Sequence, residues 1–181
     1  MLADNLLTAH RLVWMALLAA LVAAGAWIAI PIGPIPITLQ TMFIMLTGLI
    51  LGPRYAALTI LLYLTAGFLG LPIFSGGKGG LATLFGPSGG FLAGFLPAAI
   101  LAGFAGRLSF ALAQMSILTI AIFLDLALGS LQMMRVLEIS PGTALAAGFL
   151  PFLPGDILKG AAALMIFRFL DARQMLPVRQ C

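Results

Sequence analysis

The sequence predicts an all-α integral membrane protein, a single domain over residues 1–181 that forms a six-helix bundle with a ligand cavity open to its outer face. Of its residues, 62% are hydrophobic, and the mean hydropathy is +1.19. Only 8% are charged, against roughly 25% in an ordinary soluble domain, so the chain lacks the charge to cover a surface in water. The apolar residues form six blocks, which short segments rich in glycine, proline or basic residues separate.

The same composition excludes other classes of protein. Disorder requires low hydrophobicity and high charge. The net charge of +4 does not indicate a nucleic-acid partner, because the basic residues are scattered and no basic cluster contains interleaved aromatics. The only cysteine, Cys181, cannot form an internal disulfide. We therefore expect a chain that lies mostly inside the bilayer, in contact with membrane lipid.

The first predicted span runs from Leu12 to Ile30 and contains no charge. Its length suits a membrane helix, which needs about 20 apolar residues. Arg11 before it and Ala24-Gly25-Ala26 near its end also resemble a cleaved signal peptide. We favour a permanent span, because a cleaved signal is normally followed by polar sequence and the rest of this chain is equally apolar.

Five further spans and one short helix follow. The spans are expected at Ile37–Leu51, Tyr55–Leu71, Phe91–Gly106, Phe110–Leu131 and Asp156–Leu170. Several are short, which local thinning of the bilayer or flanking residues can accommodate. Pro151 and Pro154 interrupt the apolar stretch before the last span. Residues 142–153 are therefore predicted to form a short interfacial or half-buried helix.

The basic residues give an orientation for six spans. With the N-terminus inside, the cytoplasmic segments carry six basic residues and the outer loops two. The inner set is Arg11, Arg54, Arg107, Arg168, Arg173 and Arg179, and the outer set is Lys78 and Arg135. This positive-inside bias predicts that both termini are cytoplasmic.

Three irregular segments fall on the outer side in this topology. They are residues 31–36, residues 72–90 with seven glycines, and residues 149–155. The inner loops at 52–54 and 106–108 are short by comparison. Irregular backbone near membrane depth is tolerated where it is buried in protein or lines a wet cavity. The three segments therefore predict a cavity that opens to the outside.

Asp156 and Lys159 are the strongest candidates for ligand contact. A charge inside a span is costly and indicates function by default. The i, i+3 spacing places both side chains on one helix face, and Asp156 follows Pro154 in the first turn, where a negative charge is favoured. The pair offers an acceptor beside a donor, which suits a urea or an amide. The alternative is that the two charges only neutralise each other.

Other polar residues are weaker candidates. Lys78 lies between glycine pairs that include Gly77 and Gly79, so the backbone could approach a ligand closely while the lysine meets a carboxylate; a solvated loop is an equal alternative. Gln40 and Thr41 open the second span and are expected to bond a neighbouring helix or a ligand. Asp125 is expected to pair with Lys159 or Arg135 rather than to contact a ligand.

Apolar and small residues add two further candidate surfaces. Phe74, Phe85 and Phe91 flank the glycine-rich segment and could form the wall of an apolar pocket. In the first span, small residues recur every four positions, which allows close approach of a neighbouring helix or a docking partner. These residues are Ala16, Ala20 and Ala24.

The sequence offers no catalytic or metal constellation. Gly86-Pro87-Ser88-Gly89 matches a GxSG protease pattern, but the only histidine, His10, lies at the opposite side of the membrane in the predicted topology. One histidine and one cysteine far apart do not make a zinc site. The Lys78 loop is not a Walker A motif, because Gly79 stands where serine or threonine is required.

Several motifs together resemble the BioY family, the biotin-binding membrane subunits (S components) of energy-coupling factor (ECF) transporters. The resemblance covers nearly the whole chain, and five motifs occur in the right order. They are PIPITLQ at 34–40, LGPR at 51–54, GLPIFSGGKGG at 70–80, FGPSGGF at 85–91 and LPGDILK at 153–159. Asp125 lies outside these motifs.

The resemblance implies a function and partners. It implies a six-helix bundle in the bacterial plasma (inner) membrane that captures biotin from outside, with Asp156 and Lys159 at the ligand and no enzymatic activity or cofactor. It implies that the alanine stripe docks on a transmembrane coupling subunit, which two ATPase subunits drive. Two alternatives stay open at this point: an S component of the same fold for another small vitamin, and a non-catalytic structural membrane subunit.

Overall fold

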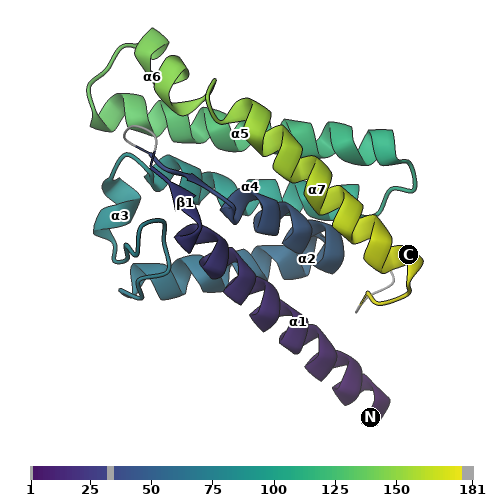
Figure 1. Cartoon of the computed structure of the whole chain (residues 1–181). Coiled ribbons are helices and arrows are strands. Elements are labelled where there is room, and N and C mark those ends of the chain that lie inside the picture. The colour runs from purple at the N-terminus through teal and green to yellow at the C-terminus, as the bar shows by residue number, and fades with distance from the viewer. Residues whose placement is uncertain (1, 32–34, 177–181) are drawn as a thin grey trace.

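The computed structural model describes residues 2–31 and 35–176, and this part of the chain is mostly helical (Figure 1). The predictions for Arg179 and Cys181 therefore concern residues outside the described part of the chain. The helices are α1 (Leu2–Trp27), α2 (Gln40–Phe68), α3 (Ala82–Phe85), α4 (Gly89–Ala105), α5 (Ala111–Val136), α6 (Pro141–Gly148) and α7 (Leu153–Ala172). Two short strands, β1 (Ala29–Ile30) and β2 (Ile37–Thr38), pair antiparallel, with Ala29 opposite Thr38.

The helix α2 reverses direction at Gly52. Gly52 has φ 75° and ψ 171°, a conformation that essentially only glycine adopts, and Pro53 follows it. In a straight helix Gln40 and Tyr63 would be about 35 Å apart, yet Gln40 Nε2 donates a hydrogen bond of 2.7 Å to the Tyr63 hydroxyl. The arms 40–51 and 53–68 therefore lie side by side, as the predicted break at 52–54 requires.

Three helical stretches of the described residues are long and apolar enough to cross a membrane: Ala9–Trp27, Gln40–Phe68 and Ala111–Val136. A fourth is possible if α6 and α7, which are bent by 42°, form one broken span. The reversal at Gly52 divides the longest of the three into two shorter arms. The remaining apolar helix, α4, has 17 residues.

Some element boundaries differ from the sequence expectation. The helix expected to reach Ile30 ends at Trp27, because Ala29 and Ile30 pair with β2 instead. This pairing satisfies backbone groups at the edge of a proline-rich segment that cannot continue a helix. The short helix expected at 142–153 is α6 and ends at Gly148. The sequence did not predict the single turn α3 within the glycine-rich segment.

The helix α4 packs between α2 and α5, and small residues allow the close approach. A Cβ atom built on Gly48 would overlap Ala102 and the carbonyl of Ala99, and one on Gly103 would overlap Pro53. Large apolar side chains instead cover the outside, including Leu112 at 81% exposed and Leu158 at 71%. An apolar exterior of this kind suits lipid contact.

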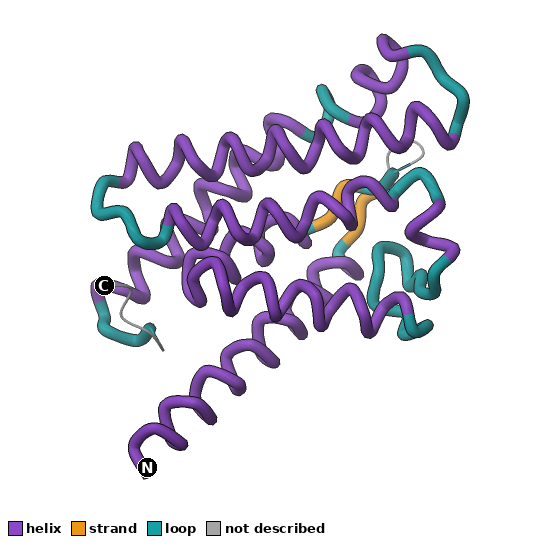
Figure 2. The backbone as a smooth tube through the Cα atoms, turned by 180° about the vertical axis from the view of Figure 1, so that it is seen from behind, coloured by secondary structure: helices purple, strands orange, loops and turns teal. Residues whose placement is uncertain are grey.

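The two ends of the bundle differ in chemistry. The start of α1 and the end of α7 lie at one end, and the irregular segments with α3 and α6 lie at the other (Figures 1 and 2). At the first end, Arg11 donates to the Tyr55 hydroxyl over 3.1 Å, and Arg168 donates to the Ser109 carbonyl and the Gln114 side chain. The basic residues of the predicted inner set that the structure describes thus gather at the end where α1 begins.

Candidate ligand-binding site

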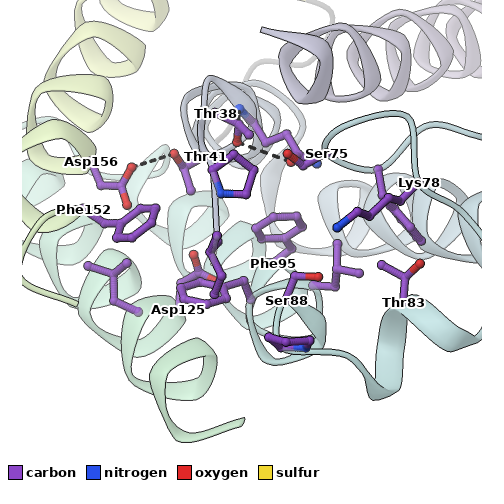
Figure 3. A pocket seen from close by; sticks show the side chains of 18 of the residues that line it. Thr38, Thr41, Ser75, Lys78, Thr83, Ser88, Phe95, Asp125, Phe152 and Asp156 are labelled. Carbon is purple, nitrogen blue, oxygen red and sulfur yellow. Dashed lines mark hydrogen bonds between the residues drawn. The ribbon is translucent and has the colours of Figure 1, made fainter. Parts of the chain in front are cut away.

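A cavity of about 130 Å³ lies at the end of the bundle where the irregular segments meet. A single water needs roughly 10–15 Å³ on such a scale, so the cavity has room for a small molecule. It is lined by Ile35, Pro36, Thr38, Gln40, Thr41, Phe74, Ser75, Lys78, Thr83, Pro87, Ser88, Phe91, Leu92, Phe95, Asp125, Leu126, Phe152, Asp156 and Lys159 (Figure 3). Segments far apart in the sequence thus converge there, as the three irregular segments predicted.

Asp156 and Lys159 form an ion pair in the cavity wall. Lys159 Nζ lies 2.7 Å from Asp156 Oδ1, and the side chains are 12% and 3% exposed. Thr41 Oγ1 donates to the same Oδ1 over 2.9 Å, and Lys159 Nζ also donates to Thr41 Oγ1 over 3.4 Å. Among the described residues, the two hydrogen bonds that the Asp156 side chain accepts both end on Oδ1, which leaves Oδ2 to accept another donor.

Gln40 holds the glycine-rich segment against α2. Its Nε2 donates to the Tyr63 hydroxyl, which donates in turn to the Ile73 carbonyl over 2.9 Å. Its Oε1 accepts from Thr38 Oγ1 over 3.3 Å. Gln40 is only 3% exposed. Its amide therefore positions the cavity wall, although the residue also lines the cavity.

A tight turn presents Lys78 to the cavity. Phe74 and Lys78 form an isolated antiparallel bridge, in which the Phe74 N–H donates to the Lys78 carbonyl over 3.0 Å. The Gly77 N–H donates to the Phe74 carbonyl, and Gly77 has φ 70°. Gly79 packs against the Leu71 carbonyl, where a Cβ would overlap. Gly77 and Gly79 shape the turn and do not line the cavity, whereas the exposed Lys78 lies at its rim.

Two of the three predicted phenylalanines line the cavity. Phe74 is 1% exposed and packs edge-on against Tyr63, and Phe91 packs against Phe152 with ring centroids 6.1 Å apart. Phe85 is 74% exposed on α3 and lies outside the cavity lining. The apolar wall is completed by Phe95 and Phe152, which the sequence did not single out.

Asp125 does not form the predicted ion pair. Its side chain is 2% exposed, and its Oδ1 has no hydrogen-bond partner in the part of the chain that the structure describes. Within the described residues, no ion pair joins it to Lys159 or Arg135. The expectation was wrong because Lys159 turns to Asp156 on its own helix, while Arg135 lies ten residues further along α5. Asp125 lines the cavity instead.

Residues 3–175 match the BioY family. The chain belongs to the BioY family. Among BioY relatives, the probable biotin transporter of Pyrococcus horikoshii is 39% identical over 153 residues, which are 84% of this chain and 90% of that protein. The biotin transporter of Thermotoga maritima is 36% identical over 166 residues, or 87% and 93% of the two chains.

A solved structure has the same fold as this BioY protein. It is the crystal structure of the S component for biotin from an ECF-type ABC transporter. It matches with a TM-score of 0.86 and 30% sequence identity, covering 91% of this chain and 92% of that chain. The family is one of transporter S components and not of enzymes.

The structure of this BioY protein separates Ser88 from His10. Ser88 lines the cavity next to the start of α4, whereas His10 lies near the start of α1, at the opposite end of the bundle. His10 Nε2 accepts a hydrogen bond from Trp14. No group of three metal-ligating side chains occurs in the described part of the chain.

The alanine stripe of this BioY protein lies on an open helix face. Ala16, Ala20 and Ala24 are all exposed, while Leu18 and Val22 on the other side of α1 are buried against the bundle. Because α1 packs mainly on α2 (Figure 1), its outer face is free for lipid or for another protein.

Ser75 is a cavity residue that the sequence did not indicate. Its Oγ is buried without a hydrogen-bond partner, three residues from Lys78. No periodicity marks such a residue in an irregular segment. The only available signal was its position beside the glycine pairs.

Proposed function

We propose that this chain is the high-affinity biotin-binding membrane subunit of a vitamin uptake transporter. It captures biotin from outside and releases it inside when coupled to an ATPase module. The observation that carries the proposal is the Asp156–Lys159 pair in the wall of the cavity, in a chain of the BioY family. Relatives named as biotin transporters support the ligand.

The polar groups of the cavity match the ureido ring of biotin. This ring has two N–H donors and one carbonyl acceptor. Asp156 Oδ2 accepts from an N–H, and Lys159 donates to the carbonyl, while Thr41 holds both groups in place. Phe74, Phe91 and their neighbours enclose the apolar rings.

The other end of the cavity suits the valerate carboxylate. Lys78 lies at the rim, and no ion pair of its side chain occurs within the described residues. Figure 3 shows Lys78 on the side opposite Asp156. A ligand with a polar ring at one end and an anion at the other would therefore span the cavity, with Gly77 and Gly79 fixing the turn that carries Lys78.

The proposed topology has six spans in one domain over residues 1–181, in the bacterial plasma membrane. The six are α1, the two arms of α2, α4, α5, and α7 with α6 before it. The arginine-rich end, where α1 begins and α7 ends, faces the cytoplasm by the positive-inside rule. The cavity at the opposite end then opens to the outside.

The proposed partners are a transmembrane coupling subunit and two ATPase subunits. The chain carries no nucleotide-binding motif, so energy for active transport must come from outside it. The exposed stripe of Ala16, Ala20 and Ala24 supports docking on α1, since small residues allow helices to approach closely.

The test is equilibrium biotin binding to the purified protein in detergent, beside Asp156→Asn and Lys159→Met variants with confirmed fold. We expect one-to-one, submicromolar binding, which each variant weakens at least tenfold, or about 1.4 kcal/mol. Absence of biotin binding by well-folded protein would overturn the proposal. Binding of another vitamin instead would indicate a different ligand for this fold, and binding of none would indicate a structural subunit.

A further inference from the structure

Asp125 is a buried carboxylate that forms no ion pair within the described residues. It lies in the middle of α5, is 2% exposed, and leaves Oδ1 without a hydrogen-bond partner. A charged side chain inside a membrane span is expensive and is rare without a role. A buried polar atom without a partner also destabilises the fold.

The fold nevertheless makes room for this carboxylate. Gly94 on α4 faces Asp125, and a Cβ atom at Gly94 would overlap both Oδ1 and the Asp125 backbone. The absence of a side chain at position 94 thus allows α4 and α5 to approach while the carboxylate stays at the cavity. Asp125 and Asp156 lie toward the same part of the cavity, away from Lys78 (Figure 3).

We propose that Asp125 is a further ligand-binding residue, whose Oδ2 accepts a hydrogen bond from the second ureido N–H of the bound ligand, because Oδ1 is buried against Gly94. The inference rests on the proposed function. The two N–H bonds of a cyclic urea flank the carbonyl and diverge, so one carboxylate oxygen cannot accept both. Asp156 offers only Oδ2, because its Oδ1 already accepts from Thr41 and Lys159. Asp125 supplies the second acceptor.

A purely structural role for Asp125 makes the opposite prediction. A residue that holds α4 to α5 should lower the stability of the unliganded protein when it is removed. A residue kept for the ligand should instead leave that stability unchanged or raise it, because its removal eliminates an unsatisfied buried group. A loss of affinity without a loss of stability therefore occurs only if Asp125 serves the ligand.

The experiment compares Asp125→Leu with Ser130→Ala. Ser130 lies on the same helix, is 5% exposed and also has an unpartnered buried oxygen, but it does not line the cavity. We expect Asp125→Leu to weaken biotin binding at least tenfold without lowering the melting temperature of the empty protein. Ser130→Ala should leave the affinity within twofold of the original protein.

Biotin analogues methylated at one or the other ureido nitrogen identify the contact. For the analogue that lacks the N–H facing Asp125, the original protein and the variant should bind equally. If Asp125→Leu does not fold, Asp125→Asn serves instead, since it keeps the shape and should show a smaller loss with the same dependence on the analogue. If the original protein binds biotin and Asp125 variants bind it equally well, this inference fails alone; if the original protein does not bind biotin, the proposed function fails.

Discussion

The Asp156–Lys159 pair should be strongly coupled in the stability of the empty protein. Lys159→Met leaves the Asp156 carboxylate, 3% exposed, with only the Thr41 hydroxyl as a donor. Asp156→Asn leaves the Lys159 ammonium, 12% exposed, without its counter-ion. Breaking a buried pair costs about 3–5 kcal/mol. Thr41 still bonds the remaining charge, and the cavity partly exposes it. We therefore expect each single variant to lose about 2–3 kcal/mol of stability, at or below the low end of that range.

The double variant should be far less damaged than the sum of the two. With both charges removed, no isolated ion stays buried, and Thr41 can still donate to the introduced amide. We expect a loss of about 1–2 kcal/mol, so the coupling energy is at least about 2 kcal/mol. For a chain of this size each kcal/mol shifts the melting temperature by about 2–4 °C.

Thermal unfolding in detergent without biotin, followed by far-UV circular dichroism, measures all four proteins of this cycle. The single variants should melt about 4–12 °C below the original protein, and the double variant should lie between them and it. Additive losses, or single variants with unchanged melting temperatures, would show that the pair is effectively solvated and does not act as a buried unit. The pair would then not be a preorganised buried site for a ligand.

Three further predictions follow from other parts of the structure. Gly52→Ala should destabilise the protein by about 1–3 kcal/mol, because φ 75° and ψ 171° exclude a side chain, while Gly155→Ala on open helix surface should be neutral in the same thermal assay. Tyr63→Phe should cost about 1–3 kcal/mol through its two lost hydrogen bonds; an unchanged melting temperature would mean that other contacts hold the glycine-rich segment. Ala20→Leu should leave biotin binding by the isolated chain intact but lower biotin uptake with the ATPase module at least tenfold, whereas Ala127→Leu, at an exposed alanine of α5, should affect neither.

Local chemistry explains which parts of the fold the sequence predicted. The break at Gly52-Pro53 and the start of α7 near Pro154 were predictable, because glycine and proline act on the backbone where they stand. The pairing of Ala29 with Thr38 was not, because it depends on residues beyond a loop.

In the site too, local features were predictable and contacts between distant segments were not. The i, i+3 spacing of Asp156 and Lys159 fixed their pairing on one helix. The sequence could not show that Phe95 lines the cavity and Phe85 does not. The helices around the cavity are apolar on every side and carry no pattern that marks the inner face. The partner of Asp125 was predicted wrongly. Whether Lys159 pairs with Asp125 or with Asp156 depends on how α5 and α7 pack, which the sequence does not give.

In the proposed binding mode, selectivity is set at the ring of the ligand rather than at its tail. Asp156, Thr41 and Asp125 lie on packed helices, and the two carboxylates are nearly fully buried. Hydrogen bonds to such charged groups contribute about 1.5–3 kcal/mol each. Lys78 is exposed on a turn, and an exposed ion pair contributes only about 0–1 kcal/mol. If these residues bind the ligand as proposed, an altered ring will leave buried groups unsatisfied, whereas a modified carboxylate will lose only a contact that water replaces.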